Sequence, residues 1–190
     1  MRRQHKFLAV CACLAAFFIG CSERKSAQYV GEGDSLFRLG KLDEAKGAYT
    51  RALEMNPANA AAKVGLGYCL IAEKKNDEAL QQFRDAIALA PEQETAYVEA
   101  VRLLLRNDNS DEAMTLAESF RGRDPRRGAR LVARVLMDTR RASEAVEMLD
   151  ALRQQYPDDR DVQRDLIAAH WAAGNAPEAE KVIRALLDSA

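Results

Sequence analysis

The 190-residue chain has few residues of the kinds that usually build catalytic or metal sites. It contains four cysteines and two histidines, and only Cys69 and His170 lie beyond residue 21. One thiol cannot form an internal disulfide, and no second histidine or cysteine pair offers the spacing of a metal site. Both residues lie on apolar helical stretches, so we expect them to be buried in a core. We therefore predict no catalytic residue, no cofactor and no metal.

The chain also lacks an excess of positive charge. It has 28 basic and 29 acidic residues and a formal net charge of −1. Removal of residues 1–20, which include Arg2, Arg3 and Lys6, would leave 25 basic and 29 acidic residues. Proteins that bind nucleic acid are normally basic, so we expect no nucleic-acid partner.

Long apolar runs are absent except near the amino terminus. Phe7–Ile19 is an uninterrupted apolar run, which follows three basic residues and precedes Gly20-Cys21. A membrane-spanning helix needs about 20 residues, whereas a positive start before a shorter run is typical of a secretory signal. We therefore expect residues 1–20 to be a signal peptide.

The end of this segment, Phe18-Ile19-Gly20-Cys21, resembles the leader of bacterial lipoproteins, although Phe18 stands where Leu is usual. The resemblance implies cleavage before Cys21 and lipidation of Cys21. With Ser22 next to the anchor, it also implies an outer-membrane position facing the periplasm. Residues 21–27 would then form a polar tether. The alternatives are an ordinary cleaved signal, which yields a secreted periplasmic protein, and an uncleaved anchor.

The remainder of the chain repeats itself at a nearly constant interval. The segment Asp43–Pro57 contains a Glu-Ala pair, an aromatic residue, a second alanine and a closing proline. This frame recurs in full at Asp77–Pro91 and in looser form three more times. The anchoring alanines are Ala45, Ala79, Ala113, Ala145 and Ala179. The prolines, which keep the same intervals, are Pro57, Pro91, Pro125 and Pro157. A fixed period of about 34 residues predicts a repeat array.

Each period is predicted to hold two helices. Apolar residues recur three and four apart, which places them on one helical face. A glutamate in each first turn favours a helix start, and the prolines end the second helix. Short polar links such as Gly40-Lys41 and Arg140-Arg141 separate the two helices of a pair. The fourth period is slightly shorter than the others, and its two missing residues are assigned to the turn after Pro125.

This layout resembles the tetratricopeptide repeat family over about Ser26 to Ala190. The second unit carries the clearest copy, in Leu66-Gly67, Ala79, Phe83, Ala86 and Pro91. The resemblance implies an all-α fold, a right-handed α-solenoid of about five helix-turn-helix repeats in a domain of residues 28–190. The expected repeats are residues 26–59, 60–93, 94–125, 126–159 and 160–190. The resemblance also implies a concave face, lined by the first helix of each pair, that holds a protein or peptide segment.

The groove is predicted from the residues of each first helix that face away from its partner helix. Its amino half is apolar and aromatic, and its carboxyl half carries arginines that suit acidic groups. The predicted partner-binding residues are Val30, Asp34, Phe37, Val64, Tyr68, Ile71, Val98, Arg102, Arg106, Arg127, Arg130, Arg134, Arg164 and Trp171. In an alternative interpretation, acidic neighbours such as Glu99, Asp138, Asp161 and Asp165 merely offset these arginines.

The leading functional hypothesis is a non-catalytic adaptor, anchored by lipid in the bacterial envelope. It is similar in layout to the small tetratricopeptide lipoproteins that help to assemble pili and secretin channels. The alternatives are a periplasmic chaperone for unfolded segments and a regulator of cell-wall enzymes. The chain ends within a helix at Ala190, so we expect Val182, Leu186 and Leu187 to stay partly exposed and to promote self-association.

Overall fold

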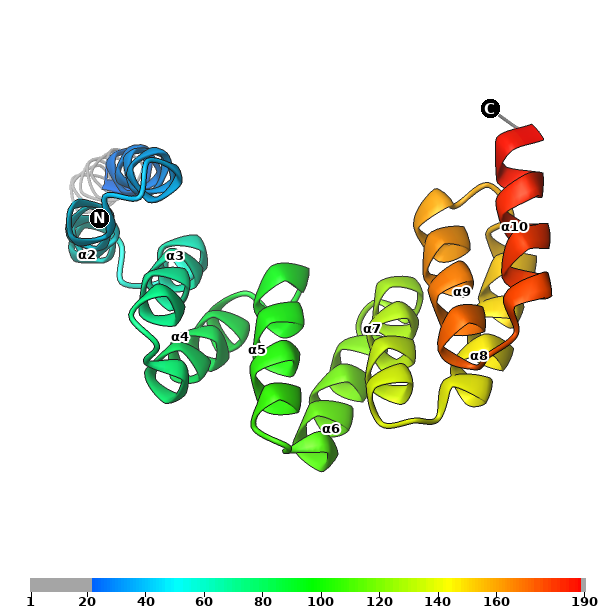
Figure 1. Ribbon diagram of the computed structural model, residues 1–190. Helices are drawn as coiled ribbons and strands as arrows, with labels where there is room; N and C mark the ends of the chain where they lie inside the picture. The colour runs from blue at the N-terminus through cyan, green and yellow to red at the C-terminus, as the bar shows by residue number, and fades with distance from the viewer. Residues whose placement is uncertain (1–21, 189–190) are drawn as a thin grey trace, which may run out of the picture. The chain divides into compact units, whose positions relative to one another are not determined.

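The protein is described here by a computed structural model of residues 22–188, in which every regular element is a helix (Figure 1). Residues 22–38 are helical, and nine labelled helices follow. Their bounds are α2 (Leu42–Met55), α3 (Ala60–Ala72), α4 (Asn76–Leu89), α5 (Glu94–Arg106), α6 (Ser110–Arg121), α7 (Pro125–Asp138), α8 (Ala142–Gln155), α9 (Arg160–Ala172) and α10 (Ala176–Asp188). The predicted signal peptide and lipidated Cys21 lie outside the described residues.

The helices fall into two compact units, which meet in sequence between Ala90 and Pro91. In the first unit, residues 22–38 and α2, α3 and α4 pack in sequence order. In the second, each helix from α5 to α10 packs on the next, and α7 also contacts α5 and α9. The predicted all-α solenoid of helix pairs is therefore confirmed within each unit.

The same three-residue turn joins the two helices of every pair. Its middle residue has a left-handed backbone, at Gly40 (φ 73°), Lys74 (63°), Asp108 (57°), Arg140 (61°) and Gly174 (77°). The following N–H then donates to the carbonyl five residues earlier, as from Arg141 to Leu136 at 2.8 Å. This Schellman arrangement satisfies carbonyls that a helix end leaves free. The predicted polar links are thus turns of one type.

The first unit is packed around the ring of Tyr49, which is 2% exposed. A Cβ placed on Gly33 would lie 2.6 Å from Tyr49 Cε1, and one on Gly65 would lie 2.3 Å from it. Only glycine therefore lets residues 22–38 and α3 approach the ring this closely. Phe83 packs on Gly67 in the same way, 2.6 Å from the corresponding Cβ position. Glycines therefore set the closest approaches between helices in this unit.

The second unit has a different core. Tyr97 of α5 and Phe120 of α6 stack with ring centroids 4.6 Å apart. At the crossing of α6 and α7, a Cβ on Gly128 would lie 2.1 Å from the Cα atom of Arg121, so the two backbones touch. His170 on α9 is buried, as predicted, and is 7% exposed.

The short fourth period differs from its neighbours around the start of α7. In three other repeats, the first helix begins three residues after the proline, but Pro125 is itself the first residue of α7. Proline suits this position because the first helical N–H has no partner within the helix. Asp124 caps the helix by accepting a hydrogen bond from the Arg127 N–H at 2.9 Å. The prediction that the missing residues belong to a turn after Pro125 is wrong, because Pro125 lies within α7. The shortening comes from α6, which has 12 residues against 14 in α4 and α8, and from the link between α6 and α7, which is one residue shorter than the links before α3, α5 and α9.

Two expectations about the ends of the described chain are corrected. Residues 22–27 are helical rather than a free tether, because Ser26 is fully buried and donates to the Ala52 carbonyl at 2.7 Å. Asn59 in turn donates to the Ser26 hydroxyl at 2.8 Å. At the other end, Val182 is buried at 8% exposure, whereas Leu187 is 68% exposed. Among residues 22–188, no helix has both the length and the apolarity to cross a membrane.

Candidate functional site

In the first unit, the predicted groove residues belong to an aromatic cluster. The rings of Phe37 and Tyr68 lie 6.0 Å apart, and Tyr68 meets Phe83 edge-on at 5.9 Å. Val30 and Phe37 are half-buried and pack against the core around Tyr49 and Cys69. The structure thus brings these apolar side chains together.

Asp34, Val64 and Ile71 differ in how much surface they offer. The Asp34 carboxylate accepts a hydrogen bond from the Tyr49 hydroxyl at 2.7 Å. Burial, reinforced by this hydrogen bond, raises the pKa of Tyr49 well above its ordinary value. Ile71 is half-buried. Val64 is only 6% exposed, so it contributes to packing rather than to a binding surface, contrary to the prediction.

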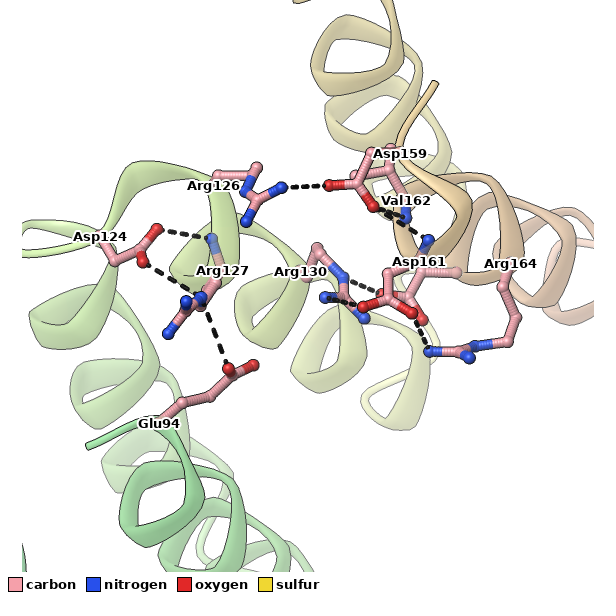
Figure 2. A network of polar contacts seen from close by, with 10 residues as sticks. Glu94, Asp124, Arg126, Arg127, Arg130, Asp159, Asp161, Val162 and Arg164 are labelled. Carbon is pink, nitrogen blue, oxygen red and sulfur yellow. Dashed lines mark hydrogen bonds and ion pairs between the residues drawn. The ribbon is translucent and has the colours of Figure 1, made fainter. Parts of the chain in front are cut away.

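In the second unit, the predicted groove residues of α5, α7 and α9 lie on three neighbouring helices. We call this surface the arginine face, and it comprises Val98, Arg102, Leu105, Arg106, Arg127, Arg130, Arg134, Met137, Arg164 and Trp171. Arginines of α7 reach both adjacent helices, as Figure 2 shows. The face is therefore continuous across the second unit.

Arg130 is the centre of an ion-pair network between α7 and α9 (Figure 2). Its Nε lies 2.6 Å from Asp165 Oδ2 and its Nη1 lies 3.1 Å from Asp161 Oδ2. The side chains of Arg130 and Asp165 are each only 16% exposed. Burial works against the charge of Arg130, but the hydrogen bond to Asp165 and the nearby aspartates raise its pKa. Arg130 therefore fastens one repeat to the next.

Asp159 forms a second link between the same repeats. It caps α9 by accepting from the N–H groups of Asp161 and Val162, at 2.9 and 3.2 Å, and it pairs with Arg126 Nη1 at 2.6 Å. Burial opposes its charge, but these backbone donors and the charges of Arg126 and Arg130 hold its pKa below the ordinary value. The Arg126 guanidinium also lies 5.7 Å from the centre of the Tyr156 ring.

Three other predicted arginines also have acidic partners within the unit. Arg127 lies 3.4 Å from Asp124 and 3.7 Å from Glu94 of α5, and Arg164 lies 2.7 Å from Asp161. Arg102 pairs with Glu99 on its own helix. For these arginines and Arg130, the interpretation that acidic neighbours offset the charge is confirmed.

Arg106 and Arg134 differ from the rest of the set. Within residues 22–188 neither forms an ion pair, and both side chains are exposed. Leu105, Met137 and Trp171 occupy matching positions of α5, α7 and α9, and Leu105 and Met137 share their helices with Arg106 and Arg134. Leu105 and Met137 are half-buried, and Trp171 is 52% exposed. Two free guanidinium groups next to an apolar row can bind a segment that has both carboxylates and apolar side chains.

Only part of the ion-pair network was predicted, since Glu99, Asp161 and Asp165 were named as acidic neighbours of the arginines but other members were not. Arg126, Asp124 and Asp159 were not singled out, although Asp124 and Asp159 precede α7 and α9 at positions where aspartate commonly caps a helix. Asp124 pairs with Arg127 three residues later, whereas the pairing of Asp159 with Arg126 of the preceding repeat has no local signal. Among the described residues, no group of His, Cys, Asp or Glu is arranged to hold a metal ion.

Solved structures with this fold come from several bacteria. A tetratricopeptide repeat protein of Thermus thermophilus is 20% identical, with a TM-score of 0.66, and the match covers 87% of this chain and 91% of that one. PilF of Pseudomonas aeruginosa is 16% identical with a TM-score of 0.67, over 85% of this chain and 74% of that one. MamA of Desulfovibrio magneticus RS-1 is 14% identical with a TM-score of 0.60, over 86% of this chain and 94% of that one. At these identities the likeness shows the fold alone.

Comparison with the sequences of curated proteins gives no match. Family models described as tetratricopeptide repeats match residues 30–94, 70–135 and 136–190. These segments cover nearly all of the described chain and agree with the helix pairs. The chain therefore belongs to the tetratricopeptide repeat family, whose members bind protein or peptide partners.

Proposed function

We propose that this protein is a non-catalytic adaptor that holds an acidic, partly apolar protein segment on its arginine face. The observation that carries the proposal is the pair Arg106 and Arg134, exposed and without ion pairs in the described chain, beside the apolar row Leu105, Met137 and Trp171. A guanidinium group matches a carboxylate with two parallel hydrogen bonds. The apolar row supplies the buried area that such pairs need in order to bind tightly.

The paired arginines support this surface in a different way. Arg130 and Arg127 are held by carboxylates of neighbouring helices, so the helices beneath the free arginines keep a fixed spacing. A preformed surface binds with a smaller loss of conformational entropy than a mobile one. Fewer positive charges are therefore available to a partner than the number of arginines on the face indicates. The guanidinium groups that are available are carried by helices with a fixed spacing.

The location in the cell is part of the proposal. The leader-like segment before Cys21 supports a lipid anchor at the outer membrane facing the periplasm, with a secreted periplasmic form as the alternative. A role in assembling pili or secretion channels rests on similarity of layout to small tetratricopeptide lipoproteins. Mass spectrometry of the mature amino terminus tests the anchor, because a chain with an unmodified Cys21, or with another first residue, would contradict it.

The binding proposal can be tested with the protein's single tryptophan as reporter. A peptide of about 14 residues with alternating pairs of Leu and Glu should change Trp171 fluorescence in a saturable way, since Trp171 is 52% exposed on this face. Replacing Arg106 and Arg134 by Glu should weaken that binding at least about tenfold. Arg134→Glu alone should also weaken binding, whereas Arg123→Glu, in the turn between α6 and α7, makes the same single change of charge away from the face and should bind normally. Equal binding by all variants would contradict the proposal.

A second candidate function, capture of unfolded segments, is favoured by the first unit. Phe37 and Tyr68 form a half-buried aromatic pair, with ring centroids 6.0 Å apart, that can hold an apolar side chain of an unfolded segment. Photocrosslinking in intact cells from position 134 and, separately, from position 37 separates the two functions. Saturable capture of one envelope protein supports the adaptor, whereas many unrelated clients support a chaperone.

Self-association through α10 also remains a proposal. It is supported by Leu187, which is 68% exposed near the end of the described chain. Sedimentation at increasing concentration tests it, and a monomer throughout would refute it.

A further inference from the structure

A trough lies on the outer side of the second unit, between α6 and α8, with α7 as its floor. Its central hollow, of about 450 Å³, is lined by Met114 and Glu118 of α6, Val132 and Leu136 of α7, and Arg141, Glu144, Glu147 and Met148 at and within α8. A neighbouring hollow of about 520 Å³ shares Met114 and Arg141 with it. A third hollow of about 340 Å³ shares Met148 with the central hollow. The hollows thus follow one another along α7.

The trough is separate from the arginine face. Its floor residues, Ala129, Val132 and Leu136, are three and four residues apart and therefore share one side of α7. Arg130, Arg134 and Met137 have the same spacing on roughly the opposite side of the helix. A ligand in the trough would therefore not contact the proposed binding surface.

The walls of the trough are apolar and adaptable. Met114 and Met148 face it from α6 and α8, and both side chains are half-buried. Methionine is unbranched and polarisable, so it can adjust to apolar side chains of different shape. Because α6 has 12 residues, the trough is about 18 Å long, enough for about three turns of a helix.

The rim of the trough is acidic. The central and second hollows together include five carboxylates, from Asp111, Glu118, Asp138, Glu144 and Glu147, and two guanidinium groups, from Arg140 and Arg141. Glu144 forms an ion pair with Arg141, with 2.7 Å between Oε1 and Nε. In the described part of the chain, Glu147, Asp111 and Asp138 form no ion pair. The third hollow adds Arg121, which pairs with Glu118 at 2.7 Å, and Arg126, which pairs with Asp159. Three unpaired carboxylates then stand against the guanidinium group of Arg140, so the unbalanced charge of the rim is negative.

We propose that the trough is a second docking surface, which takes an amphipathic basic helix of a protein partner. An apolar stripe would lie on Met114, Met148 and the α7 floor, in the manner of a helix in a groove. Lysines or arginines beside that stripe would face the rim carboxylates, which favours basic over acidic helices. An anionic membrane fits poorly, because it is repelled by the rim and presents no ridge to enter the trough.

The methionines provide a direct test. With methyl-¹³C methionine in the chain, Met114 and Met148 report on the trough, Met137 on the arginine face and Met55 on the first unit. A helical peptide of about 14 residues, with a leucine stripe flanked by lysines, should shift the Met114 and Met148 signals saturably and leave Met137 and Met55 in place. Raised salt should weaken this binding. The leucine–glutamate peptide should shift only the Met137 signal. Absence of binding at the arginine face can therefore be distinguished from absence of binding in the trough.

Variants make the assignment specific. Met148→Lys removes an apolar part of the wall and adds a charge that repels the lysines of the peptide, so we expect it to weaken binding of the lysine peptide at least about tenfold. Arg134→Glu should leave that binding unchanged. Far-ultraviolet circular dichroism checks that both variants fold. Absence of saturable binding, binding that Met148→Lys does not alter, or shifts of Met114 and Met148 only with anionic lipid vesicles would each overturn the proposal.

Discussion

In residues 22–90, successive repeats meet around an aromatic ring seated between glycines, and Lys46 pairs with Glu73 of the next repeat at 2.8 Å. In residues 91–188, a network of arginine–carboxylate pairs joins the repeats. Tyr49 lies between Gly33 and Gly65 in the first unit. Arg130 and Arg126 of α7 reach Asp165, Asp161 and Asp159 in the second. The comparison shows that one repeat pattern permits two kinds of contact between repeats. Apolar packing depends on shape, and the ionic contacts depend on pH and on the presence of both partners.

The largest effect is expected where two backbones touch in the second unit. Gly128→Ala would place a Cβ 2.1 Å from the Arg121 Cα, and backbone cannot move aside as a flexible side chain can. We expect a loss of about 3 kcal/mol in the free energy of unfolding. Urea unfolding followed by circular dichroism measures it. A loss below about 1 kcal/mol would show that α6 and α7 can separate easily.

A somewhat smaller effect is expected at the tyrosine of the first unit. Gly65→Ala should cost about 2 kcal/mol, because the Tyr49 ring is buried but can tilt. Gly47 provides a matched control, since it lies within α2 with no atom within 4 Å of its Cβ position. Gly47→Ala should stabilise the protein by about 0.5–1 kcal/mol through helix propensity. Urea unfolding of both variants tests the contrast, which fails if they change stability in the same direction.

The ionic contact of the second unit should depend on both partners. Arg130→Met leaves Asp165, whose side chain is only 16% exposed, without a cationic partner. We expect the free energy of unfolding to fall by about 2 kcal/mol. Adding Asp165→Leu should recover part of that loss, because no unpaired carboxylate then remains at that position. A double-mutant cycle by chemical unfolding measures the coupling. Strictly additive losses would mean that the pair does not stabilise the contact.

Asp159 should make the stability of the second unit depend on acid. Its folded pKa lies below the unfolded value of about 3.9, so its stabilising contribution is complete above about pH 5 and is lost as the pH falls through the folded pKa. Asp159→Asn keeps a capping oxygen but removes the charge that pairs with Arg126. The variant should be less stable than the wild type at pH 7, by about 1 kcal/mol, and approach it at pH 3. A constant difference in melting temperature between these pH values would contradict this role.

The smallest effect is expected in the turns, which the two units share. Arg140 has a left-handed backbone at φ 61°, where a residue with a Cβ is strained. Arg140→Gly should therefore change the stability by less than about 1 kcal/mol, in the stabilising direction. Gly174→Ala, at φ 77°, should be destabilising by about 1 kcal/mol. Thermal melts of both variants test this, and a stabilised Gly174→Ala would show that the turn tolerates a Cβ.

Much of the fold could be predicted because helix signals are local. The spacing of Ala45, Ala79 and Ala113, the acidic first turns and the prolines all act within a few residues, and the observed helices follow them. The prediction that Ser22–Ala27 forms a polar tether was wrong, because partners that are distant in sequence can order a polar segment. Here those partners are the Ala52 carbonyl and Asn59.

The candidate site was predictable only in part. Helical register placed the arginines on α5, α7 and α9, but it could not separate Arg130, which is held by two aspartates, from Arg134, which has no ion pair in the described chain. The outer trough was not predicted, because its walls come from α6 and α8, each the second helix of its pair, whereas the predicted groove is lined by first helices.

The sequence by itself determined the period, the helix pairs and the small residues at the crossings, since backbone hydrogen bonding and the burial of one helical face act over neighbouring residues. The tertiary structure alone decided which charges are neutralised and which surfaces stay open. Those outcomes depend on side chains about 30 residues apart in sequence, such as Arg130 and Asp161, which meet only after the repeats have packed.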